Sequence, residues 1–234
     1  MVCDNADPLY LGDRDAYHIH QCTDCGFYFT HPMPSSNLLS DLYNHYNSNT
    51  MYTKKARRKV ARVKRRIRRY KHHATGKKFL DAGCNIGSAV QAAFELGFDA
   101  HGVDIGLDGI EIARQIHPDG KYHTGEVASM PQAWAAFDFV YCADVMEHVP
   151  DPRALLLSLA DRMSRGSILY LDTPDAAHFR VPRNILTWDM VCPPYHLVYF
   201  TKKSMRHLLD QTGFDVIKFE WLHKPGLHTI ARKR

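Results

Sequence analysis

The sequence of 234 residues predicts an α/β protein with a doubly wound, mostly parallel sheet of seven strands, of which the last is antiparallel. Two observations support this prediction. From Lys77 onward, short apolar segments alternate with longer segments of helical periodicity, as in proteins that pack helices on both faces of a sheet. One segment, Phe137–Ala143, is an almost unbroken apolar run, which is typical of a strand buried on both faces of a parallel sheet.

The elements of this sheet follow one another in a regular order. Strands are expected at residues 77–82, 99–104, 121–125, 137–143, 167–172, 214–221 and 227–231, and helices at 88–96, 108–116, 154–163 and 203–211. Gly97 and Gly213 end two of the helices, because glycine readily takes the left-handed conformation that closes a helix. We therefore assign residues 77–234 to one domain, whose ligand would bind beyond the carboxyl ends of the strands.

Residues 1–34 and 35–76 lack this alternation. The first segment holds turn residues and prolines and is expected to form a small leader. The second segment predicts two helices, the first of them capped by Ser35 or Ser36. The apolar face of the first helix consists of Leu38, Leu39, Leu42, Tyr43 and Tyr46. The second helix, at residues 54–71, carries one apolar stripe, made of Ala56, Val60, Val63, Ile67 and Tyr70.

The net charge of +5 comes from this second helix. Residues 54–71 contain twelve Lys or Arg and no acid, and without them 18 basic residues face 25 acidic ones, a net charge of −7. Such a helix favours an anionic small-molecule ligand first and RNA second. A membrane surface is the third alternative, since the stripe lacks large anchoring aromatic residues. The helix can equally be a solvated cover over a cofactor site.

The composition excludes other classes of protein. With 45% hydrophobic and 24% charged residues, the chain is typical of globular rather than disordered proteins. No apolar run approaches the ~18 residues that span a bilayer, and the first residues lack the pattern of a signal peptide. We therefore expect a cytoplasmic protein without a membrane partner.

The segment after the first strand predicts a nucleotide-binding turn. Gly83 and Gly87 have the spacing G-x-x-x-G, with Asp81 two residues before the first glycine. An NAD site needs G-x-G-x-x-G, so Asn85 disfavours NAD. Asp104 ends the second strand 21 residues after Gly83, where an acid can accept hydrogen bonds from both ribose hydroxyls of an adenosine.

At these residues and at two later phrases, the chain resembles the class I S-adenosylmethionine-dependent methyltransferases, especially their small-molecule and sugar-type branch. The later phrases are Phe137-Asp138-x-Val140-x-x-x-Asp144-Val145-x-Glu147-His148-Val149-x-Asp151-Pro152 and Tyr195-His196-Leu197-Val198-Tyr199-Phe200-Thr201, the latter followed by Leu208-Leu209-x-x-x-Gly213-Phe214. The resemblance covers the chain from residue 77 and implies a Rossmann-like fold with S-adenosylmethionine as cofactor. The family usually has a second glycine where Asn85 stands. Asparagine tolerates left-handed backbone, so we expect cofactor binding to survive.

The resemblance also implies residue roles. Gly83 and Gly87 would wrap the methionine part of the cofactor, Asp81 would orient its amino group, and Asp104 would hold the ribose. The full predicted cofactor-binding set is Asp81, Gly83, Cys84, Asn85, Gly87, Asp104, Ile105, Glu126, Val127, Ala143 and Asp144. Within it, Glu126 and Val127 would lie against the adenine, and Ala143 or Asp144 would lie under the sulfonium.

His148 and His196 are the candidate catalytic bases for a hydroxyl acceptor. Both fall in loops expected at the cofactor end of the sheet, and imidazole titrates near neutral pH. Either histidine can instead be a structural hydrogen-bonding residue, and Glu147 can cap the following turn. Residues 173–200, rich in aromatic residues and prolines, are expected to contain short helical turns. Their aromatic residues would cover the acceptor or, alternatively, pack on the sheet.

Cys22 and Cys25 resemble one knuckle of the zinc ribbon that related methyltransferases carry in their leader. The first C-x-x-C of that ribbon is missing, so zinc would need Cys3 and a fourth ligand such as His18 or His20. A degenerate ribbon held by packing without metal is the alternative, and we assign no metal ligand.

The sequence thus predicts an enzyme that transfers a methyl group from S-adenosylmethionine to a small-molecule acceptor (a sugar, a nucleotide-linked compound or another metabolite), at oxygen. An RNA methyltransferase that uses the basic helix and a non-catalytic S-adenosylmethionine-binding module are the alternatives.

Overall fold

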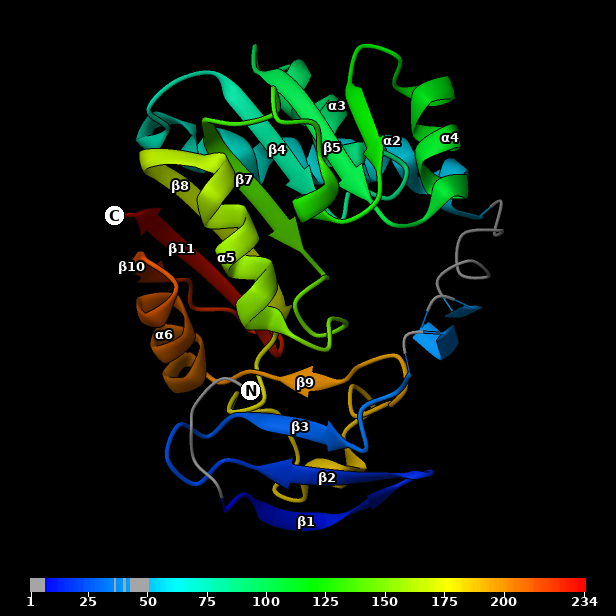
Figure 1. Ribbon diagram of the computed structural model, residues 1–234, viewed down its shortest axis with the longest axis vertical. Coiled ribbons are helices and arrows are strands. Elements are labelled where there is room, and N and C mark those ends of the chain that lie inside the picture. Colours follow the sequence, from blue (N-terminus) through cyan, green and yellow to red (C-terminus); the bar gives the residue numbers. More distant parts are fainter. Residues whose placement is uncertain (1–6, 36, 40, 43–50) are drawn as a thin grey trace.

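The computed structural model describes residues 7–35, 37–39, 41–42 and 51–234. Figure 1 shows a large sheet with helices packed on it and, below it, a small sheet. The large sheet has seven strands in the order β10-β11-β8-β7-β4-β5-β6. Their bounds are β4 (Lys78–Ala82), β5 (Asp99–Asp104), β6 (Lys121–Thr124), β7 (Phe137–Ala143), β8 (Met163–Pro174), β10 (Phe214–Phe219) and β11 (Gly226–Lys233).

The predicted sheet is confirmed in its strand number and strand directions. Strands β4 to β8 pair in parallel, and β11 runs antiparallel to both β8 and β10. The chain passes from β4 to β5 and β6 on one side, and then to β7 and β8 on the other, so the sheet is doubly wound. Strand β8 begins earlier than expected, because Met163 pairs with Phe137 instead of extending the preceding helix.

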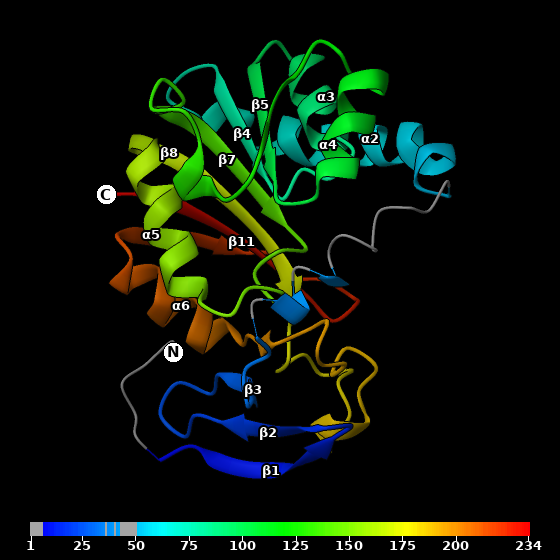
Figure 2. The same ribbon diagram turned by 45° about the vertical axis from the view of Figure 1, so that its right-hand side comes forward.

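Five long helices cover the large sheet in the described part of the chain (Figures 1 and 2). Side chains on a strand point alternately to its two faces. Phe79 and Phe139 pack in one cluster with α2 and α3, whereas Leu80 and Val140 pack in another with α5 and α6. The helices are α2 (Met51–Tyr70), α3 (Ser88–Phe94), α4 (Leu107–Ile116), α5 (Pro152–Arg162) and α6 (Lys202–Gln211), and short 3₁₀ turns lie at Lys71–His73, Val127–Ser129 and Ile185–Thr187.

Helix α2 is the predicted basic helix, and its apolar stripe is buried against the sheet. Val60, Val63 and Ile67 belong to the same core cluster as α3 and β4. The helix is therefore part of the main fold, with its cations on the remaining faces. Of the helix expected after Ser35, residues 37–39 and 41–42 are helical, while the predicted Tyr43 and Tyr46 lie outside the described residues. Among the helices that the structure describes, none is both long and apolar enough to cross a bilayer.

The leader forms an antiparallel sheet rather than an irregular turn region. Its strands are β1 (Leu9–Arg14), β2 (Tyr17–Gln21) and β3 (Tyr28–His31), and the fourth strand of the sheet is β9 (Val198–Tyr199), from far along the chain. β9 belongs to the aromatic segment that follows β8, so this segment joins the leader to the main domain. The Phe27 and Phe200 rings pack at this join, with 5.3 Å between their centroids.

Candidate active site

The predicted cofactor residues lie at the carboxyl ends of adjacent strands. β4 pairs with β5 on one side and with β7 on the other, and the chain reverses its direction of travel across the sheet at this point. Such a switch point is where open parallel sheets bind ligands. The turn after β4 contacts the loop after β7 directly, because a Cβ on Gly83 would lie 2.2 Å from Val145 Cγ2.

The turn after β4 has the left-handed backbone that its sequence predicts. Gly83, Asn85 and Gly87 have φ angles of 81°, 46° and 75°. Asn85 takes this conformation with its own side chain turned to the backbone, where Oδ1 accepts a hydrogen bond of 2.7 Å from Ile86 N. The asparagine therefore takes the left-handed conformation that glycine adopts most readily.

Asp104 fixes this turn to the end of β5. One carboxylate oxygen, Oδ2, accepts from Asn85 N at 2.7 Å, and the other, Oδ1, accepts from Gly106 N at 2.8 Å. Burial raises the pKa of Asp104, although both hydrogen bonds oppose the shift. Its carbonyl accepts from Gly125 N at 2.8 Å, which holds the end of β6 beside it. The turn after β4 and the ends of β5 and β6 are thus joined at this one residue.

Asp81 is a buried acid at the end of β4. Burial raises its pKa to about 7, Asp104 adds to this shift, and Lys59 opposes it. Lys59 comes from α2 and lowers the pKa of Asp104 and Asp144 as well, so its positive charge acts on all three acids. Lys59 was not among the residues predicted from the sequence. The signal was its position beside the apolar stripe of α2, but a stripe does not show which end of the sheet it covers.

The remaining predicted cofactor residues differ in accessibility. Cys84 is buried and its sulfur packs below Gly102, so only its backbone can contact a ligand at the turn. Ile105 is 47% exposed, and Glu126 is exposed while Val127 beside it is buried. At the end of β7, Ala143 is half-buried and Asp144 has a φ angle of 57°, its N–H bonded to Asp172 O at 2.9 Å.

The two predicted bases, His148 and His196, lie together, and Glu147 joins them. The two rings pack edge to face with 4.8 Å between their centroids. Nδ1 of His148 lies 2.7 Å from Tyr195 O, and Nδ1 of His196 lies 2.8 Å from Met190 O. Burial lowers the pKa of both rings, that of His196 to about 4, so both are neutral at pH 7.

Glu147 is 2% exposed and does not cap a turn with its side chain. Its Oε2 accepts a hydrogen bond of 2.9 Å from Thr173 Oγ1, and its Oε1 lies 3.9 Å from His148 Nε2. Burial raises the pKa of Glu147 to about 8, and the nearby carboxylates Asp144 and Asp172 add to this shift. No binding or catalytic role was predicted for Glu147. The reason is that His196, which lies close to it, comes from a segment far along the chain.

An ionic network connects α2 to the sheet beside this cluster. Arg66 donates to Asp172 Oδ2 at 2.8 Å and to Tyr141 Oη at 3.2 Å. His228 lies between Asp172 and Glu220, at 3.1 Å and 2.9 Å from their oxygens. These contacts hold the cationic helix across the ends of β7 and β8.

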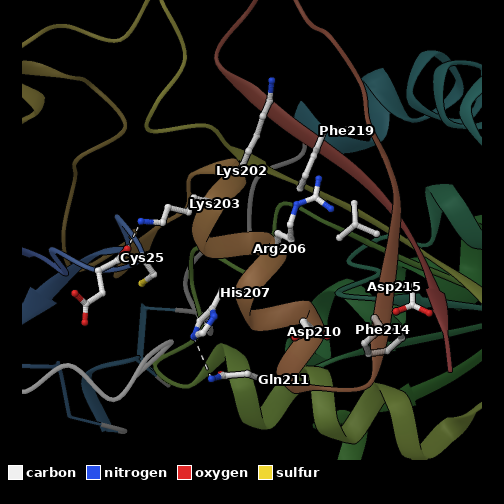
Figure 3. A pocket seen from close by; sticks show the side chains of 12 residues that line it. Cys25, Lys202, Lys203, Arg206, His207, Asp210, Gln211, Phe214, Asp215 and Phe219 are labelled. Atoms are coloured by element: carbon white, nitrogen blue, oxygen red, sulfur yellow. Dashed lines mark hydrogen bonds between the residues drawn. The ribbon is translucent and has the colours of Figure 1, made fainter.

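An open groove occupies a different part of the surface, on α6 and β10 (Figure 3). Lys202, Lys203 and Arg206 line it, and Lys203 Nζ donates to the carbonyl of Asp24. None of the predicted cofactor or catalytic residues lines this groove. The sites predicted from the sequence therefore lie elsewhere, at the carboxyl ends of β4, β5, β6 and β7.

Within the described residues of the leader, no three His, Cys, Asp or Glu side chains are arranged to hold a metal ion. Cys22 and Cys25 are buried, with a hydrogen bond of 3.5 Å from Cys25 N to Cys22 Sγ. In the described part of the chain, the one group of His, Cys, Asp and Glu side chains arranged for a metal ion is Glu147, His148 and His196. Cys3, which the zinc hypothesis requires, lies outside the described residues.

Three of the five Phe, Tyr and Trp residues in the segment 173–200 are part of the core. Trp188, Tyr199 and Phe200 are buried, whereas Phe179 and Tyr195 are exposed. Packing therefore accounts for the first three, and only the last two remain available to cover an acceptor. The turn at Ile185–Thr187 confirms the short helical turn expected in this segment.

The fold is that of the class I S-adenosylmethionine-dependent methyltransferases. A family model described as a methyltransferase domain matches residues 52–218, so the chain belongs to that family. The match begins within α2, in agreement with the burial of this helix in the main fold.

Individual relatives agree with this assignment. The chain is 32% identical over 140 residues to a ubiquinone biosynthesis O-methyltransferase of Idiomarina loihiensis, covering 56% of this chain and 54% of that protein. It is 31% identical over 152 residues to a protein of the same name from Psychrobacter arcticus, covering 62% and 53%. The chain thus spans about half the length of these relatives. Among solved structures, magnesium protoporphyrin IX methyltransferase from Synechocystis with bound SAH has a TM-score of 0.63 at 17% identity, covering 86% of this chain and 100% of that one.

Proposed function

We propose that this chain is an S-adenosylmethionine-dependent O-methyltransferase that acts on a small-molecule acceptor. The observation that carries the proposal is the adjacency of two sites at one edge of the sheet. The glycine turn and Asp104 form the first site. Glu147 and His148, just beyond the end of β7, form the second together with His196 from the segment before α6. The relatives named as ubiquinone biosynthesis O-methyltransferases support methylation at oxygen.

The residues of the first site fit this cofactor. A Cβ at Gly87 would lie 2.6 Å from Tyr122 Oη, so only glycine lets the start of α3, next to the proposed cofactor turn, pack this closely against that ring. The buried Asp81 suits the amino group of the methionine part, and Lys59 suits its carboxylate. Asp104, already oriented by two backbone N–H groups, suits the ribose hydroxyls.

The chain's task in such a reaction is mainly positioning. When bound, the cofactor supplies a methyl group already activated by its sulfonium. Correct orientation of the acceptor can supply about 7–11 kcal/mol of rate enhancement. His148 and His196 would meet the acceptor's hydroxyl, because they lie together with Glu147 beyond the carboxyl end of β7.

RNA remains the second candidate acceptor, because one face of α2 is strongly cationic. Its exposed cations in the described residues are Arg57, Arg58, Arg62, Arg65, Arg68 and Arg69. Of these, Arg69 pairs with Glu220 at 2.9 Å. An RNA acceptor would give binding that weakens steeply with salt and that is lost when these arginines are replaced.

Calorimetric titration tests the cofactor assignment. The purified protein should bind S-adenosylmethionine and not NAD, and Asp104→Ala should weaken binding by about 10- to 100-fold, as expected for loss of hydrogen bonds to a carboxylate. Asp108→Ala, an exposed acid in the first turn of α4, is the matched control and should bind like the wild type. Folded wild-type protein that does not bind S-adenosylmethionine would overturn the proposal.

A further inference from the structure

We propose that Glu147, His148 and His196 bind a divalent transition-metal ion, which holds the hydroxyl group of the acceptor. The role of the ion towards an acceptor rests on the proposed function, whereas binding of the ion does not. The sequence predicts that these two histidines act as general bases, whereas their position beside Glu147 favours metal ligation.

The three side chains have the spacing of a metal site that needs only a small closure. One ligand atom from each residue lies within 4.8 Å of the others. Two ligands on opposite sides of an ion, each at ~2.1 Å, are ~4.2 Å apart. The distance of 3.9 Å between His148 Nε2 and Glu147 Oε1 is too long for a hydrogen bond and falls within the range for two ligands of one ion.

Both histidines are held by backbone carbonyls in the manner of metal ligands. A carbonyl only accepts, so Nδ1 of His148 donates to Tyr195 O and Nδ1 of His196 donates to Met190 O. In the neutral ring the lone pair is then on Nε2, the nitrogen that would bind the ion. Thr173 orients Glu147 in the same way, through its hydrogen bond to Oε2, which leaves Oε1 on the side of His148.

The electrostatic surroundings of Glu147 favour a bound cation. Its buried carboxylate has Asp144 and Asp172 as charged neighbours, and both repel a negative charge on Glu147. Arg66 and His228 pair with Asp172, and no salt bridge to Glu147 from Lys or Arg occurs among the described residues. A divalent ion at Oε1 would offset this repulsion, as bound cations do in other carboxylate sites.

The donor set determines the kind of ion and its chemistry. Two imidazoles and one carboxylate suit a first-row divalent ion such as Zn²⁺ or Mn²⁺, and three protein ligands leave a position open for an oxygen of the acceptor. On the ion, the acceptor's hydroxyl would have a lower pKa. Its proton would pass to a water molecule, and the electron pair of the O–H bond would stay on the metal-bound oxygen.

Cobalt titration tests the ion site without any assay of activity. Chelator-treated protein is titrated with Co²⁺ and followed by its visible absorption. We expect saturation at about one ion per chain and a higher thermal midpoint of unfolding. Glu147→Gln and His196→Ala should each weaken Co²⁺ binding by at least about tenfold. His207→Ala, which removes an exposed histidine of α6, should bind Co²⁺ like the wild type.

The outcomes separate this inference from the proposed function. Wild-type protein that takes up no Co²⁺, or folded variants that bind it as tightly as the wild type, would refute the metal site. The same samples are titrated with S-adenosylmethionine in the presence of chelator. Cofactor binding without Co²⁺ uptake contradicts only the metal site. Co²⁺ uptake at these residues without cofactor binding supports the metal site and contradicts the proposed function.

Discussion

At the residue scale, the protonation of Asp81 should control cofactor affinity. Its pKa of about 7 in the free protein is raised by burial and by Asp104. The proposed contact of Asp81 with the cofactor's amino group requires the carboxylate, so binding would first have to remove a proton wherever Asp81 is protonated. Affinity for S-adenosylmethionine should therefore be level above about pH 7 and fall as the pH decreases, approaching about tenfold per pH unit.

Calorimetric titrations between about pH 5.5 and about pH 7.5 measure this dependence. Asp81→Asn is the control, because its amide does not titrate in this range. Its binding should be weaker than that of the wild type and almost independent of pH. If the variant keeps the wild-type slope, another group, such as Asp104, is responsible for it.

The residues of the candidate site were predictable where their pattern is local. The glycines, Asp81 and Asp104 stand at fixed distances from strand ends, and a strand end defines where its side chains point. No binding or catalytic role was predicted for Lys59 and Glu147, because their surroundings come from contacts between segments far apart in the chain. His196 reaches His148 only through the fold of the segment between β8 and α6.

At the element scale, α2 should be a structural helix as well as a cationic surface. Ile67 is fully buried in the cluster that α2 forms with the sheet. Ile67→Ala should lower the free energy of unfolding by about 2–5 kcal/mol, through lost burial and a residual cavity. Arg62→Ala, on the exposed face of the same helix, should change it by less than about 0.5 kcal/mol.

Chemical denaturation of the two variants measures this difference. Equal stability of Ile67→Ala and the wild type would mean that α2 is detachable from the sheet. The RNA hypothesis would then gain support, since a detachable cationic helix could bind phosphates on more than one face.

Most helices and strands were predictable from the sequence. The errors occur where pairing with a strand far along the chain determines the structure. The helices and strands of residues 77–234 appear in the expected order, because their hydrophobic periodicity is strong. The leader strands were missed because they are short and partly exposed. Strand β9 is two residues long and exists through its pairing with β3, which no local pattern contains.

At the scale of the whole molecule, the leader and the main domain share one core. Phe27 is 3% exposed and belongs to the same cluster as Leu197, Phe200 and the helix α6. The pairing of β3 with β9 adds backbone contacts, among them the bond of 2.9 Å from Thr30 N to Leu197 O. The leader should consequently unfold together with the main domain.

Phe27→Ala tests this coupling. The substitution should lower the free energy of unfolding of the whole protein by about 3–5 kcal/mol, because it removes a large ring from a shared core. Leu9→Ala, at an exposed position of β1, should change it by less than about 0.5 kcal/mol. Denaturation is followed by tryptophan fluorescence, which reports Trp188 beside the small sheet and Trp134 beside the large one, and by circular dichroism. Coincident transitions shifted together by Phe27→Ala are expected, whereas a separate early transition of the variant would show that the leader folds as an independent unit.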